Sequence, residues 1–160
     1  MHTDSSAFRV GFVPGVMPGK WERIWRERMT RRLELVPVDV GEQETALGDR
    51  RLDMCLVRGE VDREVCHLIP LYREVPVVVV PVGHPVTAYD EVDVSELDED
   101  LPVMPMSLAR LHARKDVDFR PVTGAEESPV GLAWLRERDD PDIQAFIGIV
   151  RGRTERSSRR

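Results

Sequence analysis

The sequence predicts a mixed α/β protein. Short apolar segments at Met54–Val57 and Val75–Val80 are expected as strands, and segments with helical periodicity occur before and after them. The second segment is almost entirely valine, which leaves it no polar face and is typical of a strand covered on both sides in a parallel-rich sheet. Such cover requires helices on both faces of the sheet. With 160 residues, 41% apolar and 32% charged, the chain has the composition of a soluble globular protein with one core or two lobes.

The first forty residues predict a strand, a helix and a second strand. Strands are expected at Phe8–Val13 and at Leu33–Val38, and Pro37 indicates that the second lies near a sheet edge or ends early. A helix is expected over Lys20–Met29 because its apolar residues form one stripe: Trp21, Ile24, Trp25 and Met29. We expect the two tryptophans to be core residues, with a dimer surface as the alternative.

The remaining elements are shorter, apart from the last helix. Helices are expected at Glu42–Asp49 and Leu108–Arg114, the latter with Ser107 as its N-cap. Further strands are expected at Leu101–Met104, Val117–Val122 and Val130–Leu135. The closing helix has Asp140 as its cap, Pro141 at its first position and one apolar stripe made of Ile143, Phe146, Ile147 and Val150.

Charge and cysteine content limit the function classes. The net charge is −6, and the last ten residues contribute +4 with five Arg and one Glu, which leaves −10 for the rest. The acidic charge of residues 1–150 disfavours binding to the phosphates of nucleic acids. We expect residues 1–7 to be flexible and residues 152–160 to form a disordered basic tail. The lack of a membrane-length apolar run or a signal peptide predicts a cytoplasmic location. Cys55 and Cys66 are therefore expected as free buried thiols.

Several segments carry a resemblance to a known family. Residues 52–62 (LDMCLVRGEVD) followed by residues 68–86 (LIPLYREVPVVVVPVGHPV) resemble the effector-binding domain of LysR-type transcriptional regulators. The opening FRVGFVPG and the closing VGLAWL…IQAFIGIVRGR fit the same family. The resemblance implies a type 2 periplasmic-binding-protein fold, with a nearly complete first lobe at 8–83 and 128–151 and a second lobe at 84–127.

Two departures from the family pattern bear on function. No room precedes Phe8 for a winged helix-turn-helix, so the chain resembles the sensing half alone and is expected not to read DNA sequence by itself. The acidic segment at 98–100 runs directly into Leu101, where the family normally has several tens of further residues. We therefore expect a reduced second lobe.

No catalytic or metal-binding pattern is present in the sequence. The histidines lack metal-ligand spacing, no serine lies in a nucleophile elbow, and no glycine loop has the spacing of a phosphate-binding motif. A Cys–His nucleophile pair at Cys66 and His67 is disfavoured, because neighbouring residues of a strand point to opposite faces. We expect no enzyme activity, no cofactor and no metal.

What remains is a predicted binding crevice. The loop after the first strand, which contains Gly15, Val16, Met17 and Gly19, places backbone N–H groups at a helix start, an arrangement that favours carboxylates. Arg58 ends a neighbouring strand at the same sheet edge and is expected to hold an anion. His84, at the exit to the second lobe, and Ser107, at another helix start, are weaker candidates for the same site.

Two functions from different classes follow. The leading one is a stand-alone effector-binding domain that senses a small organic anion in transcriptional regulation. The alternative is a protein-interaction module that binds no small ligand and pairs with itself or with a full-length regulator. Both exclude a membrane association and sequence-specific DNA binding by this chain alone.

Overall fold

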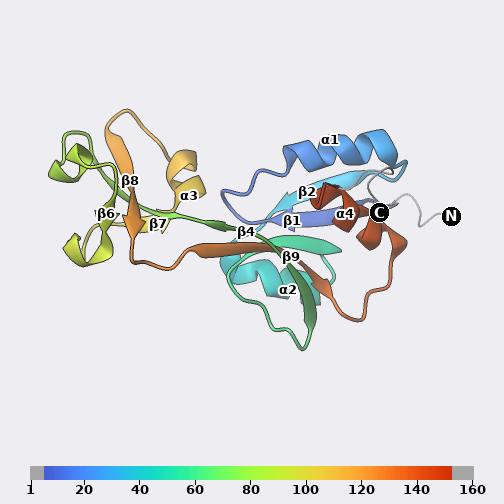
Figure 1. Cartoon of the computed structure of the whole chain (residues 1–160). Coiled ribbons are helices and arrows are strands. Elements are labelled where there is room, and N and C mark those ends of the chain that lie inside the picture. Colours follow the sequence, from blue (N-terminus) through green and yellow to red (C-terminus); the bar gives the residue numbers. More distant parts are fainter. Residues whose placement is uncertain (1–5, 153–160) are drawn as a thin grey trace. The chain divides into compact units, whose positions relative to one another are not determined.

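The computed structural model describes residues 6–152, which divide into two compact units (Figure 1). The first unit comprises the chain up to Leu71 and again from Gly131, and the second comprises Tyr72–Val130. The predicted flexible residues at the N-terminus and the predicted basic tail lie largely outside the described part of the chain. Within that part, Ala7 is buried and Ser6 accepts a hydrogen bond at its carbonyl from Arg31 Nε.

The first unit contains a five-stranded sheet with the order β2-β1-β3-β9-β4. Its strands are β1 (Phe8–Phe12), β2 (Leu33–Pro37), β3 (Met54–Arg58), β4 (Cys66–Glu74) and β9 (Ser128–Leu135). Strand β1 pairs in parallel with both β2 and β3. As expected from Pro37, β2 is an edge strand and ends at that residue.

Helices cover both faces of this sheet, as predicted. They are α1 (Gly19–Arg28), α2 (Gln43–Gly48), which follows the 3-10 turn η2 (Val40–Glu42), and α4 (Pro141–Val150). On one face, Cys55 and Val57 of β3 belong to a buried cluster with Ala46 and Leu47 of α2. Because side chains of a strand alternate between faces, the intervening Leu56 points to the other side.

An aromatic cluster forms the second core of this unit. The Phe8 ring of β1 stacks on Trp25 of α1 with centroids 5.1 Å apart, and Phe146 of α4 lies 6.1 Å from the Trp25 ring. Both Trp21 and Trp25 are buried, which confirms that they are core residues. Helices α1 and α4 therefore pack together over the β1 side of the sheet (Figure 1).

The second unit contains a four-stranded sheet with the order β6-β8-β5-β7. Its elements are β5 (Pro76–Pro81), η3 (Pro85–Ala88), β6 (Val92–Asp93), η4 (Val94–Glu96), β7 (Val103–Pro105), α3 (Met106–Leu111) and β8 (Val117–Thr123). Strand β5 pairs antiparallel with both β7 and β8, so the parallel-rich environment predicted for the valine run is wrong. The valine run indicated burial correctly, but burial does not specify strand direction. The same pairings place β5 in the second unit and not in the first lobe predicted for it.

Strand β4 has no counterpart among the predicted elements, because Pro70 and polar residues interrupt its pattern; as an edge strand it tolerates a proline, which removes one N–H donor. The predicted N-cap Ser107 is instead the second residue of α3, whose N-cap is Pro105. The Ser107 backbone N–H donates to Glu74 Oε1, so an acidic side chain satisfies the helix start.

The two cysteines are free and buried, which confirms the expectation. Cys55 lies on β3 and Cys66 on β4, with β9 between these strands. Two strand spacings amount to roughly 9–10 Å, beyond the Cα separation that a disulfide spans. The sheet itself therefore keeps the thiols apart. Throughout residues 6–152, every helix is too short to cross a membrane.

Candidate functional site

The candidate site lies at one edge of the first sheet, where two parallel strands end. In the register of β1 and β3, Val10 is opposite Met54 and Phe12 is opposite Leu56. The loop after β1 and the last residue of β3, Arg58, therefore reach the same edge, as expected from the sequence. Ligands of α/β folds commonly bind at this edge.

Arg58 is directly bonded to that loop. Its Nη1 donates to the carbonyl oxygen of Pro14 at 2.7 Å, and the residue as a whole is only 7% exposed. A guanidinium stays charged and carries five N–H donors in a rigid fork. Arg58 thus places a fixed positive charge against the loop and also holds the Pro14 carbonyl.

A buried amide holds the main chain of Arg58. Gln43 Oε1 accepts from the Arg58 backbone N–H at 3.0 Å, and Gln43 Nε2 donates to the Arg58 carbonyl at 2.9 Å. Gln43 is 3% exposed and lies on α2, on the same helical face as Ala46 and Leu47. The end of β3 is therefore tied on one side to α2 and on the other side to the β1–α1 loop.

The predicted loop residues take different roles in the structure. Gly15 has a φ of 93°, a left-handed conformation that glycine adopts without strain, and it turns the chain after Pro14. Val16 is 2% exposed and anchors the loop in the core, whereas Met17 is 77% exposed. Gly19 is the exposed first residue of α1, where the helix has no side-chain cap.

His84 and Ser107 belong to the second unit, and each has a local structural partner there. His84 Nδ1 accepts from the Val86 backbone N–H at 3.1 Å, which makes it the N-cap of η3. The Ser107 backbone N–H donates to Glu74 Oε1. The site residues that are joined by hydrogen bonds, Pro14, Gln43 and Arg58, all belong to the first unit.

Sequence reasoning missed Gln43 and the contact made by the Pro14 carbonyl. Pro14 lies in the predicted loop, but no side-chain pattern can indicate a bond to its carbonyl. The sequence contains a weak indication of the role of Gln43. It is a polar residue on the apolar face of a short helix, three and four positions before Ala46 and Leu47. A buried amide on such a face requires hydrogen-bond partners.

The arrangement has groups that can bind a ligand. It joins a fixed guanidinium, a strand-end loop and a helix start, and no group of three potential metal ligands occurs within the described residues. Such features on a two-unit α/β fold are typical of small-ligand-binding domains.

The chain belongs to the family of the LysR substrate binding domain, whose family model matches residues 8–107. This family is one of regulatory effector-binding domains. Comparison with curated proteins gives no match for this sequence.

Solved structures share the fold at low sequence identity. A point mutant of the OxyR regulatory domain from Pseudomonas aeruginosa has a TM-score of 0.74 and 17% identity, with 91% of this chain and 96% of that chain covered. The BenM effector binding domain with its effector benzoate has a TM-score of 0.71 and 13% identity, with 91% and 90% covered. Full-length CbnR in complex with its target DNA has a TM-score of 0.73 and 12% identity, with 93% and 68% covered. These likenesses confirm the predicted type 2 periplasmic-binding-protein fold.

Proposed function

We propose that this chain is an effector-binding domain that senses a small organic anion in transcriptional control and carries out no catalysis. The observation that supports the ligand class is the hydrogen bond from Arg58 to Pro14, which keeps a guanidinium against the loop that precedes α1. A positive charge and a helix start at one place both favour a carboxylate. A related domain, that of BenM, was solved with its effector benzoate. We further propose a cytoplasmic location and a reduced second lobe, consistent with the sequence.

A thermal-shift and calorimetric screen tests the ligand class. The probes are sodium salts of benzoate, acetate, succinate and similar carboxylates, with the matching chlorides as ionic-strength controls. A ligand present at about 100 times its Kd stabilises the folded state by about 2.7 kcal/mol, a shift of several degrees in Tm. At least one carboxylate is expected to reach this effect, and a screen without any such shift contradicts the proposal.

The decisive variant is Arg58→Met, which keeps an unbranched but shorter side chain and removes the charge. Because Arg58 also holds the loop, binding is measured by calorimetry on protein verified as folded, and each Tm shift is referred to the variant's own unliganded Tm. Arg23→Met, an exposed arginine on α1, is the matched control for the loss of one positive charge. Binding should weaken at least about tenfold in Arg58→Met and stay unchanged in Arg23→Met. Equal affinities in both variants would remove Arg58 from the site.

The second candidate function is a protein-interaction module that pairs with another copy or with a full-length regulator. The second unit supports it by exposing large apolar side chains: Val82, Tyr89 and Leu111 are 60%, 65% and 56% exposed. Exposed apolar side chains of this size gain free energy when a partner removes them from water. Sedimentation velocity over a range of concentrations distinguishes the two functions. Self-association that is abolished by Leu111→Glu, in a chain that binds no carboxylate, would favour the interaction module.

A further inference from the structure

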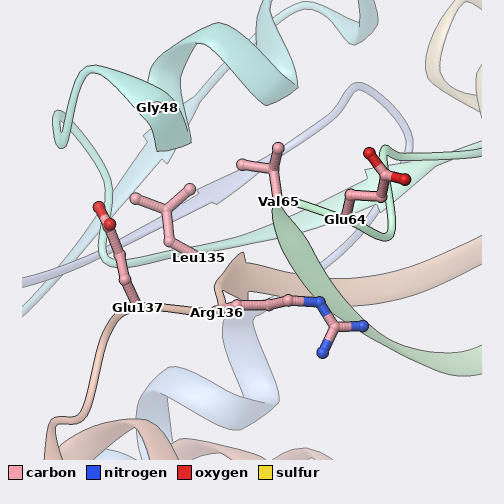
Figure 2. Close-up of a pocket in the computed structure, with 6 residues that line it drawn as sticks. All are labelled: Gly48, Glu64, Val65, Leu135, Arg136 and Glu137. Carbon is pink, nitrogen blue, oxygen red and sulfur yellow. The ribbon is translucent and has the colours of Figure 1, made fainter.

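A separate pocket lies at the end of the first sheet opposite the candidate site. It has a volume of about 360 Å³ and is lined by Gly48, Glu64, Val65, Leu135, Arg136 and Glu137 (Figure 2). Gly48 ends α2 ahead of β3, and Leu135 ends β9, whereas Arg58 is the last residue of β3. The ion pair between Arg138, after β9, and Asp53, before β3, confirms that these two strand ends meet. The volume falls within the range of small-ligand sites.

The floor of the pocket is apolar, and a hydrogen bond and an ion pair hold the segments that form it. Leu135 is 5% exposed and belongs to the buried cluster under α2, whereas the neighbouring Val65 is 49% exposed. The Arg136 backbone N–H donates to the Val65 carbonyl at 2.9 Å, which holds the two segments together. An ion pair between Arg50 and Glu137 connects the end of α2 to the segment after β9.

The polar rim of the pocket favours a cation. Glu64 and Glu137 contribute carboxylates, which Figure 2 shows on either side of Val65 and Leu135. The Arg136 side chain extends away from Glu137, and its Nε donates to the Arg63 carbonyl at 2.6 Å while Nη1 contacts His67 Nδ1 at 3.2 Å. Glu137 is already neutralised by Arg50, so Glu64 is the carboxylate that a ligand would engage.

Two further carboxylates act on the thiol of Cys66, the residue that follows Val65. Burial raises the pKa of the Cys66 thiol, and the carboxylates of Glu44 and Asp62 raise it further, while Arg136 opposes them.

We propose that this pocket binds a small aliphatic amine, with the ammonium group on Glu64 and the alkyl chain on Val65 and Leu135. This site is distinct from the candidate effector site, and it takes a ligand of opposite charge. Effector binding at Arg58 and amine binding at Glu64 can therefore be tested independently.

The test uses n-butylammonium chloride as the probe, with ammonium chloride and sodium butyrate as controls for the alkyl chain and for the charge. Binding is followed by calorimetry and by methyl NMR of valine and leucine residues. We expect a Kd on the order of 1 mM or tighter for butylammonium, weaker binding of both controls, and shifts of the Val65 and Leu135 methyl signals.

Glu64→Gln keeps the shape of the rim and removes the charge, and it should weaken butylammonium at least about tenfold. Glu60→Gln, an exposed acid in the same loop that does not line the pocket, is the matched control and should bind as the unchanged protein does. Val65→Ser, at an exposed position, should weaken butylammonium binding and leave ammonium binding unaffected. Butylammonium binding no better than ammonium, equal losses in the two glutamine variants, or methyl shifts elsewhere would each overturn the proposal.

Discussion

Gln43 binds both backbone polar groups of Arg58, through hydrogen bonds of 3.0 Å and 2.9 Å between residues fifteen positions apart. At the end of β3, the amide side chain thus bonds the main chain in the way that a neighbouring strand does. Because Arg58 in turn holds Pro14, the position of α2 and the conformation of the β1–α1 loop are linked by three hydrogen bonds. Gln43 is therefore a positioning residue of the candidate site.

Replacing Gln43 should destabilise the fold strongly, because its amide is buried and makes two hydrogen bonds. Gln43→Ala leaves the backbone N–H and C=O of Arg58 without these partners in a buried place, at a cost of about 1–3 kcal/mol for each unsatisfied group. We expect a loss of about 2–4 kcal/mol in the free energy of unfolding, measured by urea denaturation. Thr45→Ala, at an exposed position of the same helix, should stay within about 0.5 kcal/mol of the unchanged protein. Similar stabilities for the two variants would contradict the role assigned to Gln43.

Burial of the Cys55 thiol should make stability depend on pH in the alkaline range. Desolvation, together with the nearby Cys66, raises the pKa of Cys55 from 9.0 to about 12. The folded state therefore keeps a proton that the unfolded state loses, so this contribution to stability is complete below pH 9 and is lost as the pH rises toward 12. Above pH 9 the loss should approach about 1.4 kcal/mol per pH unit.

Other groups titrate in the same range, so the measurement compares the protein with Cys55→Ala by urea denaturation at pH 8, 9 and 10. The stability difference between the two proteins should shift with pH by the amount attributed to Cys55. A difference that stays constant over this range would show that the Cys55 thiol ionises equally in both states.

Two glycines should respond in opposite ways to alanine. A Cβ at Gly131 of β9 would lie 2.7 Å from Leu68 Cδ1 and 2.8 Å from the backbone oxygen of Ile69, which cannot move without disturbing β4. Gly131→Ala should therefore cost about 1–3 kcal/mol or more in the free energy of unfolding. A Cβ at Gly148 of α4 meets no atom within 4 Å, and alanine is the better helix former, so Gly148→Ala should stabilise by up to about 1 kcal/mol. Thermal denaturation of both variants is the measurement. Equal Tm values for Gly131→Ala and Gly148→Ala would contradict the close approach of β9 and β4.

Duplex DNA should bind this chain weakly and without regard to sequence. Residues 1–150 carry a net charge of −10, while the last ten residues carry +4. Binding should be detectable at low salt, should disappear at physiological salt, and should disappear in a chain that ends at Arg151. Fluorescence anisotropy with two unrelated duplexes of equal length is the measurement. Tight binding that distinguishes the duplexes and survives both changes would contradict the charge argument.

Local patterns were sufficient for most elements of the first unit. The closing helix was predicted with the bounds of α4, Pro141–Val150, because a cap at Asp140, a proline and an apolar stripe act within a few residues of one another. In the same way, Pro37 alone predicts that β2 lies near a sheet edge or ends early, and the structure has both features. Strand β4 escaped prediction because an edge strand with Pro70 has neither a continuous apolar run nor a regular alternation.

The amino-acid sequence alone is sufficient to place most strands and helices, to bring Arg58 and the β1–α1 loop to one sheet edge, and to indicate the family. The antiparallel pairing of β5 in the second unit and the bonds between Gln43 and Arg58 depend on tertiary packing. The difference lies in the range of the interactions. Periodicity, caps and turns depend on residues close in sequence, whereas the partner of a strand or of a buried amide depends on which distant segment packs beside it.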